Sequence, residues 1–205
     1  FNGIFEGIKI KSIGSSAFFY SVFTGDFNCP NLKTVGENAF LKSVFTGDFN
    51  CPNLQAVSSA AFYYSQLNGV FNCPNLTSVG DNAFFYSVFT GVFNCPNLKI
   101  VGYNVFYNSV FTGDFNCPNL KTVDYNAFRY SVFNGVFNCP NLQAVGQNAF
   151  ENSNFTQITI GANATLGTGC IGAHSAEFIN DYAANGKLAG TYVWNAGTNH
   201  WIYQG

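Results

Sequence analysis

Hydrophobic and polar positions repeat along this chain with a period of 22 residues, beginning with the segment 21–42. Further copies of the segment begin at Ser43, Ser65, Ser87, Ser109 and Ser131. Residues 1–20 fit the same frame as a partial first copy, and the chain from Ser153 onward fits it as a decaying last copy. A single copy cannot enclose its own apolar side chains, whereas stacked copies can. The period therefore predicts a repeat protein.

Phenylalanine marks the positions that we expect to be buried. Three columns of the repeat, which begin at Phe1, Phe5 and Phe18, hold 21 of the 24 phenylalanines. The first column departs once, at Leu67, which is still apolar. Further apolar columns run through Leu32, Val35 and Ala39. Burial of each large apolar side chain stabilises a protein by ~1.5–3 kcal/mol, so these columns predict one interior shared by all copies.

Within one copy, the chain alternates between two faces just before a proline. One face carries Phe23, Gly25, Phe27 and Cys29, and the other carries Thr24, Asp26 and Asn28. Such alternation predicts a half-buried strand over residues 23–29, which Pro30 ends because it lacks a backbone donor. Gly36 marks a second corner, where the backbone can take a left-handed or turn conformation.

Identical strands that run in one direction, each returned by a short irregular arc, form a parallel-stranded solenoid. We therefore predict an α/β repeat solenoid with a concave parallel β-sheet and a mostly irregular, turn-like convex side. About eight copies at a strand spacing of about 4.8 Å give a sheet roughly 35–40 Å long. Residues 1–170 are predicted to form this solenoid, and residues 171–205 a C-terminal cap.

The tail differs from the repeats and contains both tryptophans. A short helix is predicted to be capped near Ser175 and to end at Gly186. Residues 191–194 and 200–203 flank a glycine-containing turn and predict a hairpin. The chain starts inside a copy, so either it is a trimmed product or its first turn presents an open edge that could pair with another chain.

The charge composition argues against several functions. Charged residues make up only 9% of the chain and the net charge is −2, so no strong field steers the protein toward nucleic acid or anionic lipid. Apolar residues never run together for the ~20 positions of a membrane-spanning helix, so no transmembrane segment is expected. No secretory signal is recognisable from Phe1, so either a leader was removed or none existed.

Six cysteines occupy one column of the repeat. They are Cys29, Cys51, Cys73, Cys95, Cys117 and Cys139. Stacked side chains on parallel strands fit disulfide torsions poorly, and no CxxC spacing or histidine partner indicates a zinc site. We expect buried free thiols that behave as small hydrophobic side chains, and neither a metal nor another cofactor. Cys170 has no obvious partner.

The outward positions of the strand column are the predicted binding residues. They are Thr24, Asp26, Asn28, Thr46, Asp48, Asn50, Asn68, Val70, Asn72, Thr90, Val92, Asn94, Thr112, Asp114, Asn116, Asn134, Val136 and Asn138. The aspartates share their column with valines, which favours a mixed polar and apolar binding face over the converging oxygen ligands of a calcium site. Asn28 is the expected contact residue, whereas Asn31 follows the strand and is expected to satisfy neighbouring backbone groups.

Catalytic chemistry has little basis in the sequence. His174 and His200 are the only histidines, and neither lies in a recognisable motif. No GxSxG motif or glycine-rich phosphate loop is present, so we expect no enzyme activity.

Tyrosines recur in the arc of the repeat. Tyr20, Tyr64, Tyr86 and Tyr130 share one column, beside Tyr63 and Tyr107. Partial burial against the next turn is the favoured interpretation. The alternative is an exposed association surface on the convex side.

Short motifs carry a resemblance to a known family. The corner at 35–40 recurs at 13–18 and 145–150, and it resembles the IGxxAF signature of BspA-like (treponemal-type) leucine-rich repeats. Residues 155–160 match that family's LxxLxL strand, and residues 188–192 are similar to its C-terminal cap. The unit here is one residue shorter than is usual in the family, and the central strands carry Phe-Asn-Cys-Pro-Asn in place of an aliphatic strand end.

The resemblance implies a right-handed leucine-rich-repeat superhelix and a protein that is secreted, on the cell surface or in the periplasm of a bacterial envelope. It implies adhesion and protein binding. Our leading hypothesis is a non-enzymatic module that binds a host or bacterial surface protein through its concave strand face. The alternatives are a structural envelope protein that forms homo-oligomers through its N-terminal edge, and a carbohydrate-binding module that uses exposed tyrosines and asparagines.

Overall fold

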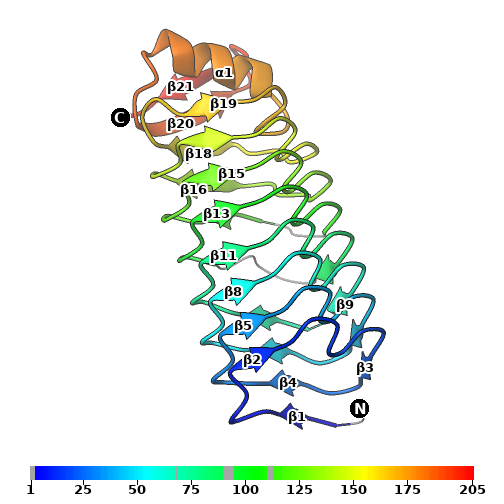
Figure 1. Ribbon diagram of the computed structural model, residues 1–205. Coiled ribbons are helices and arrows are strands. Elements are labelled where there is room, and N and C mark those ends of the chain that lie inside the picture. The colour runs from blue at the N-terminus through cyan, green and yellow to red at the C-terminus, as the bar shows by residue number, and fades with distance from the viewer. Residues whose placement is uncertain (1–2, 68, 90–94, 110–112) are drawn as a thin grey trace.

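The chain winds into a stack of short parallel strands, as the computed structural model shows for residues 3–67, 69–89, 95–109 and 113–205 (Figure 1). Each coil lies directly on the one before it, and a helix and a hairpin cover the C-terminal coil. The predicted parallel-stranded repeat solenoid is confirmed. In the described residues, no helix is long and apolar enough to cross a membrane.

The predicted strand column lies in two sheets of parallel strands. Paired residues are 22 positions apart in the sequence, except that residues 136–139 pair with residues 157–160, which lie 21 positions later. The first part of the column comprises β1 (Phe5–Glu6), β4 (Phe27–Asn28), β7 (Phe49–Asn50) and β10 (Phe71–Asn72). The same column continues in β14 (Phe115–Asn116), β16 (Val136–Cys139) and β18 (Gln157–Ile160). Phe27 pairs with both Phe5 and Phe49, so the register stacks identical residues.

The single strand predicted over residues 23–29 is wrong, because the chain bends within it. A separate four-stranded sheet contains β3 (Val22–Phe23), β6 (Val44–Phe45), β9 (Gln66–Leu67) and β12 (Val88–Phe89). Phe23 and Phe27 would lie about 13 Å apart along a straight strand. The bend instead brings their rings to 5.6 Å between centroids, edge to face, inside the coil.

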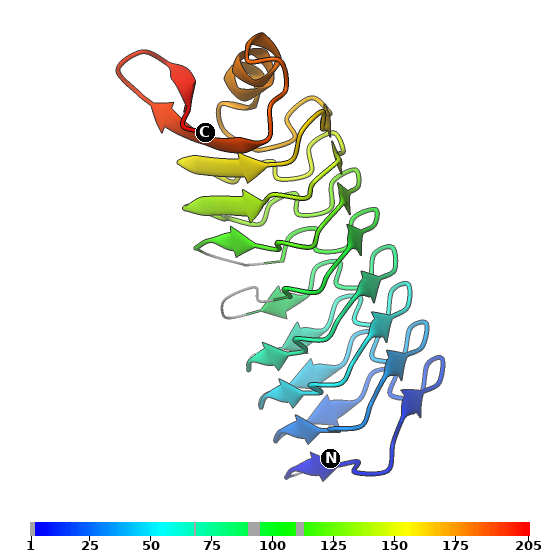
Figure 2. The ribbon, with the colours of Figure 1, turned by 90° about the vertical axis from the view of Figure 1, so that its left-hand side faces the viewer.

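A third side of the coil carries an eight-stranded parallel sheet where an irregular arc was expected (Figure 2). Its strands are β2 (Ser12–Ile13), β5 (Thr34–Val35), β8 (Ala56–Val57), β11 (Ser78–Val79), β13 (Ile100–Val101), β15 (Thr122–Val123), β17 (Ala144–Val145) and β19 (Thr165–Leu166). The first residue of β5 is exposed and the second is buried. Parallel strands therefore lie on three sides of the interior.

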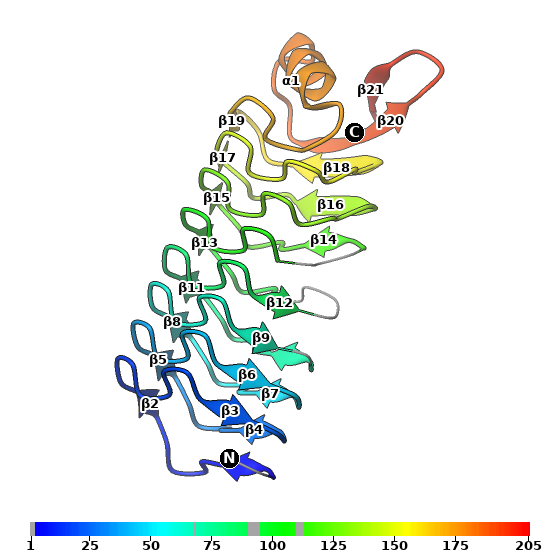
Figure 3. The same cartoon turned by 90° about the vertical axis from the view of Figure 1, so that its right-hand side faces the viewer.

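Each coil closes through a turn-rich arc that lies on the same side of every copy (Figure 3). Left-handed backbone occurs at Asn38 and Lys42, both with φ of 54°, and not at Gly36. Asparagine tolerates this conformation better than most residues do, and it fills the Asn38 column in most copies. Gly36 is instead a point of close approach, since a Cβ there would lie 2.8 Å from the backbone of Gly14.

The three phenylalanine columns fill the interior, as predicted. Phe27 and Phe40 are fully buried, and their rings stack on those of the next coil at 5.0 Å and 4.9 Å between centroids. Phe1, Phe93 and Phe111 lie outside the described residues. A buried serine column completes the interior, in which Ser43 donates a hydrogen bond to the carbonyl of Phe18 (2.6 Å).

The C-terminal elements close the last coil. They are α1 (Ser175–Ala184), β20 (Gly190–Asn195) and β21 (His200–Tyr203). Strand β20 pairs antiparallel with β18, and β21 pairs with β20, so the predicted hairpin is present. Gly186, with φ of 68°, follows the helix as predicted. The helix start differs, because Ser175 is buried and accepts a hydrogen bond from the amide of Ile171, while left-handed His174 is the N-cap.

Helix α1 also covers the outer edge of the hairpin. The Oδ2 atom of Asp181 accepts a hydrogen bond from the backbone amide of Trp201 at 2.7 Å, and its Oδ1 atom lies 2.9 Å from Nδ1 of His200. The indole of Trp201 donates to the carbonyl of His174. An edge amide of the last strand is thereby satisfied by a side chain of the helix.

Candidate functional site

The outward side chains of the strand column form one polar surface, which we call the Asp–Asn face. Its members are Asp26, Asn28, Asp48, Asn50, Val70, Asn72, Asp114, Asn116, Val136 and Asn138. The face follows from alternation: Phe27 and Cys29 point inward and are buried, so their neighbours Asp26 and Asn28 point outward. The structure therefore brings most of the predicted binding residues together on one side of the coil.

A shallow hollow of about 340 Å³ lies over the first four strands of this face. Its lining residues are Ile4, Glu6, Asp26, Asn28, Asp48, Asn50, Val70 and Asn72. Three of these carry carboxylates, whereas the two ion pairs among the described residues lie elsewhere, at Arg129–Glu151 and His200–Asp181. Ile4 and Val70 are 64% and 58% exposed, so the hollow combines uncompensated negative charge with apolar surface.

The aspartates also hold neighbouring coils together. Oδ1 of Asp26 accepts a hydrogen bond from the backbone amide of Asp48 at 2.9 Å, and Oδ1 of Asp48 accepts one from Val70 at 2.8 Å. Glycine makes room for this contact: a Cβ at Gly69 would lie 2.6 Å from Oδ1 of Asp48. One carboxylate oxygen of each aspartate is thus committed to the fold. Substitutions at these positions must keep that acceptor to leave the coil intact.

The asparagines of the face form a side-chain ladder. Nδ2 of Asn72 donates to Oδ1 of Asn50 at 2.9 Å, and Asn138 donates to Asn116 in the same way. In the second asparagine column, Asn31 donates to the carbonyl of Ile8, and its equivalents donate to a proline carbonyl of the preceding coil. The predicted backbone role of the Asn31 column is confirmed.

The remaining predicted residues lie beside the face or outside the described part of the chain. Thr24 and Thr46 are exposed at the bend that precedes β4 and β7, outside the strands. Asn134 accepts a hydrogen bond from the amide of Gly113 at 3.1 Å. Five predicted residues fall outside the described part of the chain: Asn68, Thr90, Val92, Asn94 and Thr112.

Sequence reasoning missed two residues of the hollow, Ile4 and Glu6. Both belong to the partial first copy, where the polar column carries Glu6 in the place of Asn28, and Ile4 in the place of Asp26. Strand β1 pairs Glu6 with Asn28 directly, which sets its carboxylate at the end of the asparagine ladder. The 22-residue frame itself contained this signal, because the two positions align with the predicted columns.

Behind the face lies the cysteine column. All seven cysteines are free and buried. Burial raises the pKa of Cys95 to about 12 and also raises the pKa of Cys73 and Cys117, so these thiols stay protonated near neutral pH. Within the described residues, no three His, Cys, Asp or Glu side chains are placed to hold a metal ion.

Comparison with known families gives one match. The model of the BspA type leucine rich repeat region matches residues 4–112 and 57–175, with six copies of the repeat. Together these ranges cover nearly all of the solenoid. Among curated proteins, none matches the chain.

Proposed function

Because the chain belongs to the BspA-type leucine-rich repeat family, we propose that it is a non-enzymatic module that binds a protein through the Asp–Asn face. The family suggests protein–protein interaction and adhesion, and its members are typically secreted or on the cell surface. We propose the same location for this protein, in a bacterial envelope. The observation that carries the proposal is the hollow with three uncompensated carboxylates on an otherwise weakly charged chain.

The chemistry of the hollow defines the partner. Glu6, Asp26 and Asp48 favour a lysine or arginine, because hydrogen bonds between charged groups are roughly twice as strong as neutral ones. The amides of Asn50 and Asn72 suit a polar backbone or side chain beside it, and exposed Val70 suits an apolar neighbour. The proposed ligand is therefore a protein surface with a basic side chain next to an apolar one.

The test uses substitutions that remove charge and keep the fold. In the double variant Asp26→Asn/Asp48→Asn, the amide oxygen can still accept the amide hydrogen bonds from Asp48 and Val70. The matched control is Asp114→Asn, because Asp114 holds Val136 in the same way but does not line the hollow. The wild-type protein, the double variant and the control should give the same circular dichroism spectrum and thermal midpoint.

Each protein is immobilised and used to capture partners, without crosslinking, from host and bacterial surface fractions. We expect the double variant to lose the captured protein, or to bind it at least about tenfold more weakly, and the control to retain it. The captured protein should also elute as salt concentration rises. Equal capture by all three proteins would remove the hollow from the proposed binding site.

A further inference from the structure

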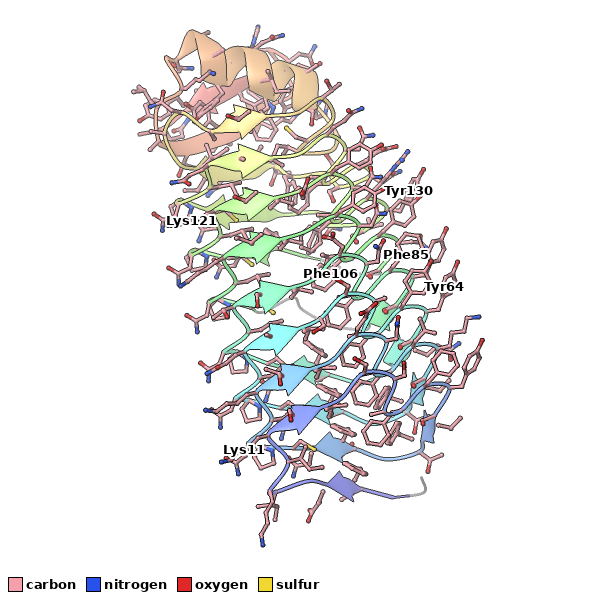
Figure 4. All side chains as sticks on the ribbon, in the orientation of Figure 1. Lys11, Tyr64, Phe85, Phe106, Lys121 and Tyr130 are labelled. Atoms are coloured by element: carbon pink, nitrogen blue, oxygen red, sulfur yellow. The ribbon has the colours of Figure 1, made fainter. Side chains whose placement is uncertain are left out.

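A row of aromatic side chains runs along the arcs of successive coils, separate from the Asp–Asn face. This aromatic strip comprises Phe19, Tyr20, Tyr63, Tyr64, Phe85, Tyr86, Tyr107 and Tyr130. Tyr64, Phe85 and Tyr130 lie at one edge of the molecule, away from Lys11 and Lys121 (Figure 4). Partial burial was predicted for the tyrosine column. Tyr20, Tyr64, Tyr86 and Tyr130 are 38–56% exposed, and Tyr64 stacks on Tyr86 of the next coil, so each ring is partly covered and partly open to solvent.

The rings of the strip are already ordered by one another. Tyr63, Phe85 and Tyr107 form a continuous stack with centroid distances of 5.0 Å and 4.9 Å, and Tyr64 stacks on Tyr86 at 5.0 Å. Their faces cover each other, so ring edges and hydroxyl groups remain for an external partner. A sugar ring stacks on an exposed aromatic face, which this arrangement does not offer. Packing against other protein side chains suits it better, and preordered rings lose little entropy on binding.

The backbone conformation at these tyrosines carries an energetic cost. Tyr20, Tyr64, Tyr86 and Tyr130 have φ between 54° and 63°, a left-handed conformation that costs a tyrosine about 1 kcal/mol. Other copies place Asn108 and Asn152 at the same position with φ of 55° and 77°. Asparagine adopts this conformation more readily, so backbone preference favours asparagine over tyrosine at these positions. A contact outside the chain that favours tyrosine would offset this backbone cost.

The two ends of the strip differ in charge. Near its N-terminal end, exposed Lys42 lies between Tyr20 and Tyr64 in the column and donates a hydrogen bond to the hydroxyl of Tyr20 at 2.8 Å. Near its C-terminal end, Glu151 carries a carboxylate, 2.7 Å from the guanidinium of Arg129. The side chain of Glu151 remains 36% exposed, so it can accept a second cation.

We propose that the aromatic strip is the interface of a homodimer in which two copies pack antiparallel about a two-fold axis. The axis lies between the arc of Tyr86 and the arc of Tyr107. Lys42 then approaches Glu151 of the partner subunit, and Tyr63 approaches Arg129 of the partner subunit, as a cation over an aromatic ring. The central aromatic arcs face each other.

Charge selects this orientation over the parallel one. In a parallel two-fold pair, every residue would face its own copy, and Lys42 would meet a second lysine. The antiparallel pair replaces that repulsion with two symmetric attractions between Lys42 and Glu151. A different protein could supply similar contacts, but only a second copy is matched to both ends of the strip by its own sequence.

The first experiment measures the mass of the protein by sedimentation equilibrium over a wide concentration range. We expect wild-type protein to approach twice the chain mass, and the double variant Tyr64→Asn/Tyr86→Asn to remain monomeric. Both substitutions introduce asparagine, which the same column already holds at Asn108, so the fold should persist. The matched control is Ile100→Thr, because Ile100 is 55% exposed on the eight-stranded sheet and its column holds Thr122.

The second experiment tests orientation by disulfide trapping. Residues 42 and 152 face each other across the proposed axis, so Lys42→Cys mixed with Asn152→Cys should give a crosslinked heterodimer under mild oxidation. Lys42→Cys alone should give almost none. A strictly monomeric wild-type protein, or efficient crosslinking of Lys42→Cys with itself, would overturn the proposal. Dimerisation that survives the Tyr64→Asn/Tyr86→Asn change would also overturn it.

Discussion

The buried thiols make a quantitative prediction about alkaline stability. Burial raises the pKa of Cys95 and Cys170 from the ordinary 9.0 to about 12, and it also raises the pKa of Cys73, Cys117 and Cys139. The folded protein therefore keeps these thiols protonated at a pH where the unfolded chain ionises them. Above pH 9 the unfolded state binds fewer protons than the folded state, so stability must fall as pH rises toward 12.

The size of the effect follows from the number of thiols. At pH 10, a thiol with an unfolded pKa of 9.0 that stays protonated in the fold destabilises the protein by about 1.4 kcal/mol. Five such thiols remove about 7 kcal/mol, which is comparable with the whole stability of a typical domain. Cys29 acts in the opposite direction, because a hydrogen bond with Cys51 lowers its pKa. At pH 8 the same groups together remove only about 0.3 kcal/mol. We therefore expect cooperative unfolding near pH 10.

The measurement is the urea midpoint, followed by circular dichroism in a reducing buffer at pH 8, 9 and 10. The double variant Cys95→Ala/Cys117→Ala tests whether thiol ionisation causes the loss of stability. It starts less stable because it leaves cavities, but it should lose about 3 kcal/mol less between pH 8 and pH 10. Tyr192, whose pKa burial raises to about 12, adds about 0.4 kcal/mol to the loss at pH 10 and more above it. An equal urea midpoint at pH 8 and pH 10 would refute the reasoning.

Three further predictions concern stability and are measured by urea unfolding at pH 7. Ser65→Ala should lower the free energy of unfolding by about 1 kcal/mol, because the buried hydroxyl donates to the carbonyl of Phe40; no change would mean that this hydrogen bond contributes nothing. Phe62→Ala should lower it by about 3–5 kcal/mol, since the fully buried ring stacks on both neighbouring coils. Asp181→Ala should lower it by about 1–3 kcal/mol by leaving the amide of Trp201 unsatisfied, whereas Asp181→Asn should retain most of the stability.

The interior could be predicted from the sequence because a burial pattern repeated many times leaves little ambiguity. Each copy of the repeat independently indicates that the same position is buried. In one such column, Phe27, Phe49 and Phe115 are all buried. The asparagine corner was predictable for the same reason, since Asn31 follows the strand in a fixed place in every copy.

Other features depend on geometry that a linear pattern does not contain. Alternation from Phe23 to Cys29 is equally compatible with a straight strand and with a bent one, and ring packing inside the coil decides for the bend. A left-handed or turn conformation was expected at Gly36 from residue type alone, whereas the left-handed backbone of the arc lies at Asn38. The exposure of Tyr64 depends on how far the arc projects from the core, which residue type does not reveal.

In the described part of the Asp–Asn face, the side-chain hydrogen bonds of Asp26, Asp48 and Asn72 each join equivalent positions of neighbouring coils, so the number of coils could be changed. The carboxylate of Asp26 accepts a hydrogen bond from the amide of Asp48, and the carboxylate of Asp48 accepts one from the amide of Val70. If one 22-residue unit were removed or inserted, neighbouring coils could still form the same hydrogen bonds. Such edits would shorten or extend the molecule in steps of about 4.8 Å. The number of coils would therefore set the length of the solenoid, while the side chains that fill its core stay the same.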